Sequence, residues 1–199
     1  MPRLNSPTKD AIAGLECLIR LELDNIVVVS TREQAALAYK ALALHPVLGF
    51  DTESKPTFVR DEISEGPHVV QFSTLHKAYI FQVHDAGCRE VVSALLVAAQ
   101  IIKVGFGLAG DHVQIMRTLG VRPLNVLDLN DIFKAQGYPK EIGVRGAVAV
   151  MFNRRFLKSR KATTSNWSNR QLTQSQIIYA ANDAWAAIKV FDALGLPQG

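Results

Sequence analysis

The chain has 199 residues, of which 48% are hydrophobic and 20% are charged, so it can bury one core without disulfides or structural metals. No apolar run approaches the roughly 20 residues of a membrane span, and residues 1–23 lack the apolar stretch of a signal peptide. With only two isolated cysteines, the composition excludes a disulfide scaffold and predicts a soluble, cytoplasmic protein with no membrane partner.

Positive charge is concentrated in one part of the chain. The net charge is +4, but residues 142–182 contain no Asp or Glu, and they hold Arg145, Arg154, Arg155, Lys158, Arg160, Lys161 and Arg170. A solvated surface and a polyanion-binding surface both fit such a run. Asn166, Trp167 and Asn169 are interleaved with the cations, and this mixture favours nucleic acid, since stacking and phosphate contacts occur together on single strands.

The first half of the chain predicts short elements of both types. An N-terminal helical extension, residues 1–25, contains a helix over Asp10–Arg20. The elements expected next are a strand at Ile26–Val29, a helix at Arg32–Leu44, a strand at Val47–Glu53, a loop at Ser54–Pro67 and a hairpin of Val69–Thr74 with Tyr79–Val83. His45-Pro46 ends the helix that precedes the second strand.

The second half alternates strands and helices. A helix is expected at Arg89–Ala99, a strand at Ile101–Val104, a helix at Asp111–Leu119 and a strand at Asn125–Leu129, and the remainder is mostly helical. Antiparallel strands followed by strand–helix units predict an α/β fold, in which a mixed sheet carries helices on both faces. Residues 26–195 are therefore expected to form a single domain.

An acidic pair follows the second predicted strand. In Phe50-Asp51-Thr52-Glu53, the side chains of Asp51 and Glu53 are two residues apart and point to the same face. Two adjacent carboxylates repel each other, and a divalent cation relieves that repulsion. Alone, the pair fits a solvated loop as well as a metal site.

A glycine-rich turn lies between the strand at 101–104 and the next helix. Gly105-Phe106-Gly107-Leu108-Ala109-Gly110 matches the dinucleotide fingerprint G-x-G-x-x-G, and Asp128 lies where a ribose-binding acid is expected. Asp111 follows the turn directly, however, and its charge would repel a pyrophosphate at the start of the helix. A metal ligand and a helix-capping acid are the other interpretations of Asp111.

The last helix has a defined beginning. Thr173 and Gln176 form a capping box, and Leu172 with Ile177 form a hydrophobic staple. Tyr179 and Asp183 are four residues apart on this helix and share one face. A buried aspartate needs a partner, and together with Asp51, Glu53 and Asp111 it predicts an acidic site.

These motifs in this order resemble the DEDDy 3′–5′ exonuclease family, which includes ribonuclease D and the Werner-type exonuclease domain. The resemblance rests on GFDTES, VGFGLAGD and YAANDAWA, and on Ser165-Asn166-Trp167-Ser168, and it extends from about Val27 to Leu194. It implies a ribonuclease H-like sheet and 3′→5′ hydrolysis of DNA or RNA that releases nucleoside 5′-monophosphates.

The resemblance also implies roles for individual residues. Asp51, Glu53, Asp111 and Asp183 would hold two Mg²⁺ or Mn²⁺ ions, with Asp51 shared between them, and Tyr179 would position the attacking water. Oxygen-only donors suit these ions and argue against structural zinc. The sequence itself suggests the residues that contact nucleic acid: Lys158, Arg160, Lys161 and Arg170 at the phosphates, and Thr52 and Trp167 as further contacts. Phe106 and Leu108, beside Asp111, either wedge against the terminal base or pack in the core.

Two alternatives remain open from the sequence. A non-catalytic nucleic-acid-binding relative would keep the basic segment but typically lose one of the acids, and all are present. A dinucleotide-binding protein would use the glycine-rich turn and Asp128, and it would leave Tyr179 and Asp183 unexplained. The sequence does not identify a protein partner or a preference between DNA and RNA.

Overall fold

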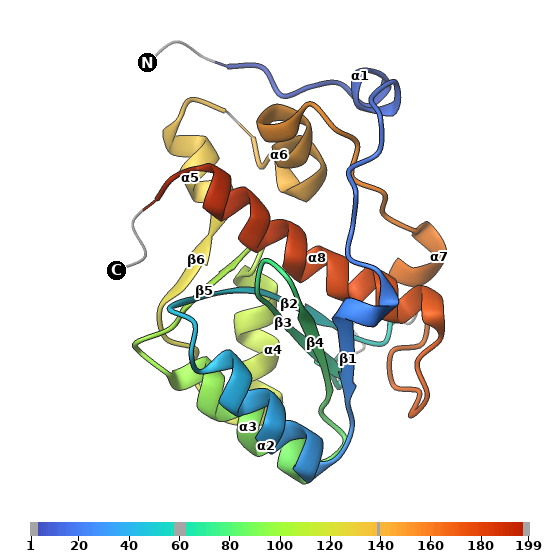
Figure 1. Ribbon diagram of the computed structural model, residues 1–199, viewed down its shortest axis with the longest axis vertical. Coiled ribbons are helices and arrows are strands. Elements are labelled where there is room, and N and C mark those ends of the chain that lie inside the picture. The colour runs from blue at the N-terminus through green and yellow to red at the C-terminus, as the bar shows by residue number, and fades with distance from the viewer. Residues whose placement is uncertain (1–3, 58–62, 139, 197–199) are drawn as a thin grey trace.

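The polypeptide forms a six-stranded mixed sheet covered by helices on both faces, as the sequence predicts (Figure 1). This computed structural model describes residues 4–57, 63–138 and 140–196. In chain order the elements are α1 (Lys9–Ala13), the 3₁₀ helix η1 (Leu23–Asn25), β1 (Ile26–Val29), α2 (Arg32–Leu42), β2 (Val47–Glu53), β3 (Val69–Ser73), β4 (Ala78–Gln82), α3 (Ala86–Val97), β5 (Ile102–Gly105), α4 (Ala109–Leu119), β6 (Val126–Asp128), α5 (Leu129–Ala135), α6 (Gly143–Phe152), α7 (Arg160–Thr163) and α8 (Gln174–Ala193).

The strand order is β1-β4-β3-β2-β5-β6. The central strands β2, β3 and β4 pair antiparallel, whereas β1 pairs parallel with β4, and β5 and β6 continue from β2 in parallel. The predicted hairpin of β3 and β4 is confirmed, and its turn is closed by the amide of Thr74, which donates to the carbonyl of Lys77 (2.9 Å). β2 therefore lies in the middle of the sheet, where both of its faces are covered.

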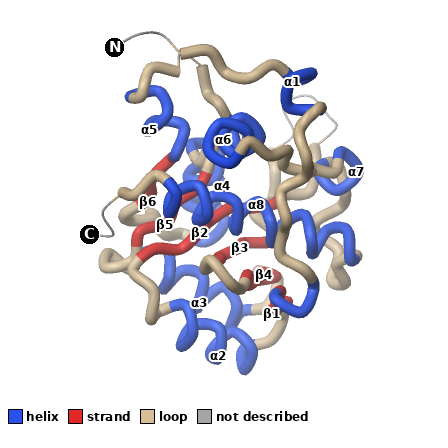
Figure 2. The backbone as a smooth tube through the Cα atoms, turned by 45° about the horizontal axis from the view of Figure 1, so that its top comes forward, coloured by secondary structure: helices blue, strands red, loops and turns tan. Residues whose placement is uncertain are grey.

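The two faces of the sheet carry separate cores. Alternate residues of a strand point to opposite faces, so Val47 packs in the cluster that contains α8, whereas Leu48 and Phe50 pack in the cluster that contains α2, α3 and α4. Figure 2 shows α2 and α3 on one side of the sheet and α6 and α8 on the other. The residues of β2 that share the face of Val47 therefore point toward α8.

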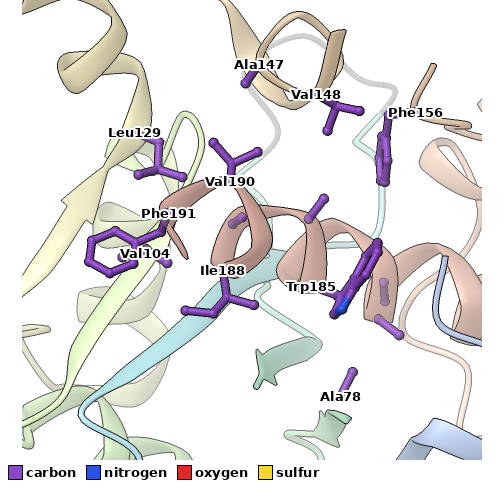
Figure 3. Close-up of a cluster of buried hydrophobic side chains, with 14 of the residues drawn as sticks. Ala78, Val104, Leu129, Ala147, Val148, Phe156, Trp185, Ile188, Val190 and Phe191 are labelled. Carbon is purple, nitrogen blue, oxygen red and sulfur yellow. The ribbon is translucent and has the colours of Figure 1, made fainter. Parts of the chain in front are cut away.

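Helix α8 is packed between the sheet and the helices outside it. Figure 3 shows its residues Trp185, Ile188, Val190 and Phe191 among Val104 of β5, Leu129 of α5, and Ala147 and Val148 of α6. The predicted capping box is confirmed: the hydroxyl of Thr173 accepts from the amide of Gln176 (3.3 Å), and Oε1 of Gln176 accepts from the amide of Thr173 (3.0 Å).

A glycine allows α8 to approach β2 closely. A Cβ atom on Gly49 would lie 2.0 Å from the carbonyl oxygen of Ala184, far inside van der Waals contact. Any larger residue would push the helix away from the strand. The backbone of α8 therefore lies directly over β2 at Gly49, two residues before Asp51 on the same strand.

The predicted N-terminal helix is shorter than expected. The prediction of a helix over Asp10–Arg20 is wrong beyond Ala13, because the chain after Gly14 runs alongside residue 155. The amide of Arg155 donates to the carbonyl of Glu16 (2.8 Å), and the amide of Leu18 donates to the carbonyl of Arg155 (2.9 Å). Pairing with a segment about 140 positions away in the sequence replaces the local helical hydrogen bonds.

Most other predicted elements are confirmed, with shifted ends. α2 ends at Leu42, and α3 begins at Ala86 because Asp85 caps it. The predicted loop at 54–67 contains no helix or strand in its described part, and residues 58–62 lie outside the described residues. Among the residues that the structure describes, no helix has both the length and the apolar character needed to cross a bilayer.

Candidate active site

The acidic end of β2 points toward α8. Asp51 and Glu53 follow Gly49 at two-residue intervals, so all three lie on the face that α8 covers. Thr52 points to the opposite face, toward α4, where its hydroxyl donates to Oδ1 of Asp111. β2 thus places the carboxylates of Asp51 and Glu53 on the face that α8 covers. On its opposite face, Thr52 fixes the carboxylate of Asp111.

The face of α8 that covers β2 carries Asp183. One carboxylate oxygen from each of Asp51, Glu53 and Asp183 lies within 4.8 Å of the others. The Asp183 side chain is only 4% exposed, and its Oδ1 has no hydrogen-bond partner among the described residues. A buried carboxylate oxygen without a partner is costly, so this group fits a bound cation.

Burial and mutual repulsion perturb these carboxyl groups strongly. Burial, followed by the charge of Asp183, raises the pKa of Asp51 well above its ordinary value. The same causes, with Asp51 as the nearest charge, raise the pKa of Glu53 to about 10. Burial also raises the pKa of Asp183, although Lys158 opposes that rise. Without a cation, burial and mutual repulsion therefore favour the protonated form, most clearly at Glu53.

A lysine lies in the acidic cluster. Nζ of Lys158 is 2.7 Å from Oδ2 of Asp183 and 5.1 Å from the centre of the Tyr179 ring. Burial opposes the charged form of Lys158, but the carboxylates of Asp183 and Asp51 outweigh that effect and raise the pKa of the amine. The ammonium thus supplies positive charge at the position where a divalent cation would be held.

Asp111 is close to the cluster but is not part of it. It lies in the first turn of α4, and burial raises its pKa while the hydrogen bond from Thr52 lowers it. The three-carboxylate group does not include it. This position fits a ligand that acts through water.

The glycine-rich turn uses Asp128 for its own structure. Oδ2 of Asp128 accepts from the amide of Leu108 (2.9 Å), and Oδ1 accepts from the amide of Asn130 (2.9 Å) at the start of α5. Gly107 has a φ of +72°, which favours glycine in the turn. Both oxygens of Asp128 accept from backbone amides, so the position of this acid is explained by the structure of the turn and of α5 without a bound dinucleotide.

The sequence profile of the 3′–5′ exonuclease family matches residues 26–196, nearly the whole described chain. The chain belongs to the 3′–5′ exonuclease family. The mouse bifunctional 3′–5′ exonuclease/ATP-dependent helicase WRN is 28% identical over 151 residues, which are 75% of this chain and 11% of the mouse protein. A 3′–5′ exonuclease of Arabidopsis thaliana is 24% identical over 170 residues, which are 84% of this chain and 56% of that protein.

Solved structures show the same fold. Ribonuclease D of Trypanosoma brucei superposes with a TM-score of 0.76 at 22% identity, over 85% of this chain and 64% of that one. The exonuclease domain of Aedes aegypti Nibbler gives a TM-score of 0.74 at 18% identity, over 88% and 89% of the two chains. The ribonuclease H-like fold that the sequence resemblance implies is therefore confirmed.

Tyr179 of this exonuclease-family chain is fixed by two residues of the basic segment. Thr163 on α7 donates to the Tyr179 hydroxyl (3.0 Å), and the indole of Trp167 packs on the Tyr179 ring with centroids 5.9 Å apart. Burial, followed by the charge of Asp183, raises the pKa of the Tyr179 phenol. The hydroxyl therefore stays protonated and has a defined position above the acidic cluster.

Of the eight predicted nucleic-acid contacts, Thr52 bonds to Asp111 and Lys158 pairs with Asp183, and the other six fall into two groups. Arg160, Lys161 and Arg170 are exposed and Phe106 is half-buried. Leu108 and Trp167 are each 1% exposed and belong to the core. The burial of Leu108 favours the core-packing alternative, and contact of either side chain with nucleic acid stays a prediction.

The sequence does not predict the hydrogen bonds that fix the loop between α7 and α8. Nε2 of Gln82, at the end of β4, donates to the carbonyls of Asn169 (3.1 Å) and Arg170 (3.0 Å), and Nε2 of Gln176 donates to the carbonyl of Asn166 (3.2 Å). These amides fix the loop between α7 and α8, which carries the exposed Arg170. A glutamine in a strand gives no indication of such a partner.

Proposed function

We propose that this chain is a metal-dependent 3′→5′ exonuclease, which releases nucleoside 5′-monophosphates from the 3′ ends of DNA or RNA by a two-metal mechanism. The observation that supports it is the convergence of oxygens from Asp51, Glu53 and Asp183 within 4.8 Å. These acids lie in a chain whose family profile spans residues 26–196. All the acids of the family signature are present, which favours catalysis over binding alone.

The acidic side chains would hold the ions. Following the family resemblance, Asp51 would ligate both, Glu53 and Asp183 would each ligate one, and Asp111 would act through water. Mg²⁺ or Mn²⁺ bound there would lower the pKa of the attacking water and stabilise the leaving 3′ oxygen. The donor set consists of carboxylate oxygens, which these hard cations prefer and which a structural zinc site lacks.

Two neighbouring side chains would serve the substrate. Tyr179, held by Thr163 and kept protonated, would orient the attacking water by a hydrogen bond rather than take its proton. Lys158 would leave Asp183 when the ions bind and pair with a phosphate oxygen, because an ammonium and a divalent ion compete for the same carboxylate. The exposed Arg160, Lys161 and Arg170 would bind more distant phosphates.

A digest of end-labelled strands tests the proposal. A 5′-labelled oligonucleotide with Mn²⁺ should give a ladder that shortens from the 3′ end, with nucleoside 5′-monophosphates as the product identified by mass spectrometry. Asp183→Asn should abolish the ladder, whereas Asp192→Asn, an exposed acid on the same helix, should not change it. Internal cuts, 3′-monophosphate products or full activity of Asp183→Asn would refute the assignment.

Comparing the rates of digestion of DNA and RNA strands of the same sequence gives the preference of the enzyme between the two substrates. Loss of digestion in Asp183→Asn, together with unchanged affinity for the strand, would separate catalysis from binding and exclude a protein that only binds nucleic acid. A cytoplasmic location remains a prediction from the sequence.

A further inference from the structure

A basic pocket lies between the N-terminal helix and the chain that leads from α6 to α7. Its cavity has a volume of about 380 Å³, and its cationic lining consists of Lys9, Arg145, Arg155, Lys158 and Arg160. Among the residues that the structure describes, no acidic side chain lines it. Figures 1 and 2 both show α1 beside α6 and over this connection, so segments far apart in the sequence form one pocket.

The basic pocket also has an apolar floor. Ile12 of α1, Phe156 and Leu157 line it between the cations, and Leu157 is 48% exposed. Lys158 is paired with Asp183. The other four cations, around a concave apolar surface, repel one another and attract an anion. A ligand with phosphate groups and a less polar sugar or base matches both parts of this lining.

The N-terminal segment is fixed to the rest of the protein by hydrogen bonds. The guanidinium of Arg155 donates from Nη1 to the carbonyl of Ala13 (2.9 Å) and from Nη2 to Sγ of Cys17 (3.3 Å). These bonds hold the segment that carries Lys9, in addition to the backbone pairing of residues 16–18 with Arg155. The pocket is therefore a formed surface to which the N-terminal extension contributes one wall.

One residue, Lys158, links the basic pocket to the acidic cluster. Lys158 lines the pocket and lies 2.7 Å from Asp183, and Nη2 of Arg145 donates to the carbonyl of Lys158 (3.0 Å). The pocket therefore lies next to the acidic cluster, with Lys158 in contact with both.

We propose that this pocket binds internucleotide phosphates of the strand being degraded, on the 5′ side of the scissile bond, and that α1 is thereby part of the substrate site. The inference rests on the proposed exonuclease function. An enzyme that removes the 3′-terminal nucleotide has every phosphate beyond the scissile one on the 5′ side, so a cationic pocket next to the acidic cluster can only meet those phosphates. The preferred substrate is then a strand longer than a dinucleotide.

The length of the substrate provides the test. A dinucleotide with a 5′-hydroxyl carries one phosphate, the scissile one, whereas a twelve-nucleotide strand with the same 3′ end carries phosphates for the pocket. Lys9→Glu should raise KM about fivefold for the long strand and leave the dinucleotide unchanged, because one exposed ion pair is lost. The slope of log Kd against log salt should fall by about one for this variant. Lys40→Glu, an exposed lysine on α2 across the sheet, is the matched control.

Binding of the labelled long strand without metal measures the pocket independently of hydrolysis. Weaker binding by Lys9→Glu than by Lys40→Glu supports the pocket even if no digestion is seen, in which case only the proposed catalytic function fails. Equal binding by the two variants, or an equal loss of activity on both substrate lengths, would overturn the inference while leaving the exonuclease assignment intact. Thermal melting of each variant confirms that the fold is retained.

Discussion

The ammonium of Lys158 lies 2.7 Å from the carboxylate of Asp183, inside the group of acids that would hold divalent ions. Because the two cations would occupy the same place, the lysine and a metal ion compete for Asp183. The ammonium of Lys158 offsets part of the negative charge of the acidic cluster in the absence of an ion, and the proton favoured on Glu53 removes another part.

Removing this lysine should tighten metal binding and destabilise the metal-free protein. Lys158→Met takes away the competitor, so the Kd for Mn²⁺ measured by calorimetry should fall. The unfolding free energy without metal should drop by about 3 kcal/mol, because a largely buried carboxylate loses its partner. Saturating Mn²⁺ should restore much of that loss. Lys161→Met, exposed on α7, is the control, and unchanged or weaker Mn²⁺ binding in Lys158→Met would contradict competition.

The metal-free protein should lose stability as pH rises. The pKa of Glu53 is about 10 in the fold and is raised from 4.5, so the folded state holds a proton that the unfolded state releases above its own pKa. Stability therefore falls with increasing pH across that window. Denaturant unfolding in EDTA at about pH 6 and about pH 9 should show this decline, and Glu53→Gln should reduce it.

Protons bound by the acidic cluster, such as the proton on Glu53, also oppose the binding of Mn²⁺. Mn²⁺ must displace them, so its affinity should rise with pH, and binding at neutral pH should release protons into the buffer. Calorimetry in two buffers of different ionisation enthalpy measures that release. An affinity that does not vary with pH would show that the carboxylates are already ionised.

Thr163 should affect turnover through Tyr179. Thr163→Val removes the hydrogen bond to the Tyr179 hydroxyl and should lower kcat about tenfold with little change in KM. Tyr179→Phe removes the hydroxyl itself and should lower kcat about a hundredfold. Thr164→Val is the control, because the Thr164 hydroxyl donates to the carbonyl of Arg160 rather than to Tyr179. If Thr163→Val acts equally in the Tyr179→Phe background, the two residues are not coupled.

Gly49 should be intolerant of a methyl group. Gly49→Ala would place a Cβ atom 2.0 Å from the carbonyl oxygen of Ala184 and should lower the unfolding free energy by about 2 kcal/mol or more. Because α8 would move away from β2, Asp183 would also separate from Asp51, and activity should fall even where the protein folds. Gly110→Ala, where an added Cβ meets nothing within 4 Å, should not destabilise. Equal stability of the two variants would contradict the close packing of α8 on β2.

The sequence predicts the elements and acids whose signals are local. Asp51 with Glu53 follows from the two-residue period of a strand, Tyr179 with Asp183 follows from the helical period, and the start of α8 follows from its capping box. The hairpin of β3 and β4 is likewise confirmed, because adjacent segments pair through one short turn.

The contacts that the sequence does not predict are long-range. Lys158 was expected at a phosphate, but its partner in the fold is Asp183, which lies 25 positions further along the chain. α1 ends at Ala13 because residues 16–18 pair with Arg155, and Trp167 is buried because it packs on Tyr179. In each case a tertiary partner decides the outcome, and no periodicity or composition identifies that partner.

A crystal structure of the protein with Mn²⁺ would test the central claim most directly, because anomalous scattering locates the ion without assumptions about the protein. We expect anomalous peaks between the carboxylates of Asp51, Glu53 and Asp183, with the Lys158 ammonium withdrawn from Asp183. A map with no peak among these acids at saturating Mn²⁺, and with the Lys158–Asp183 ion pair intact, would contradict the account.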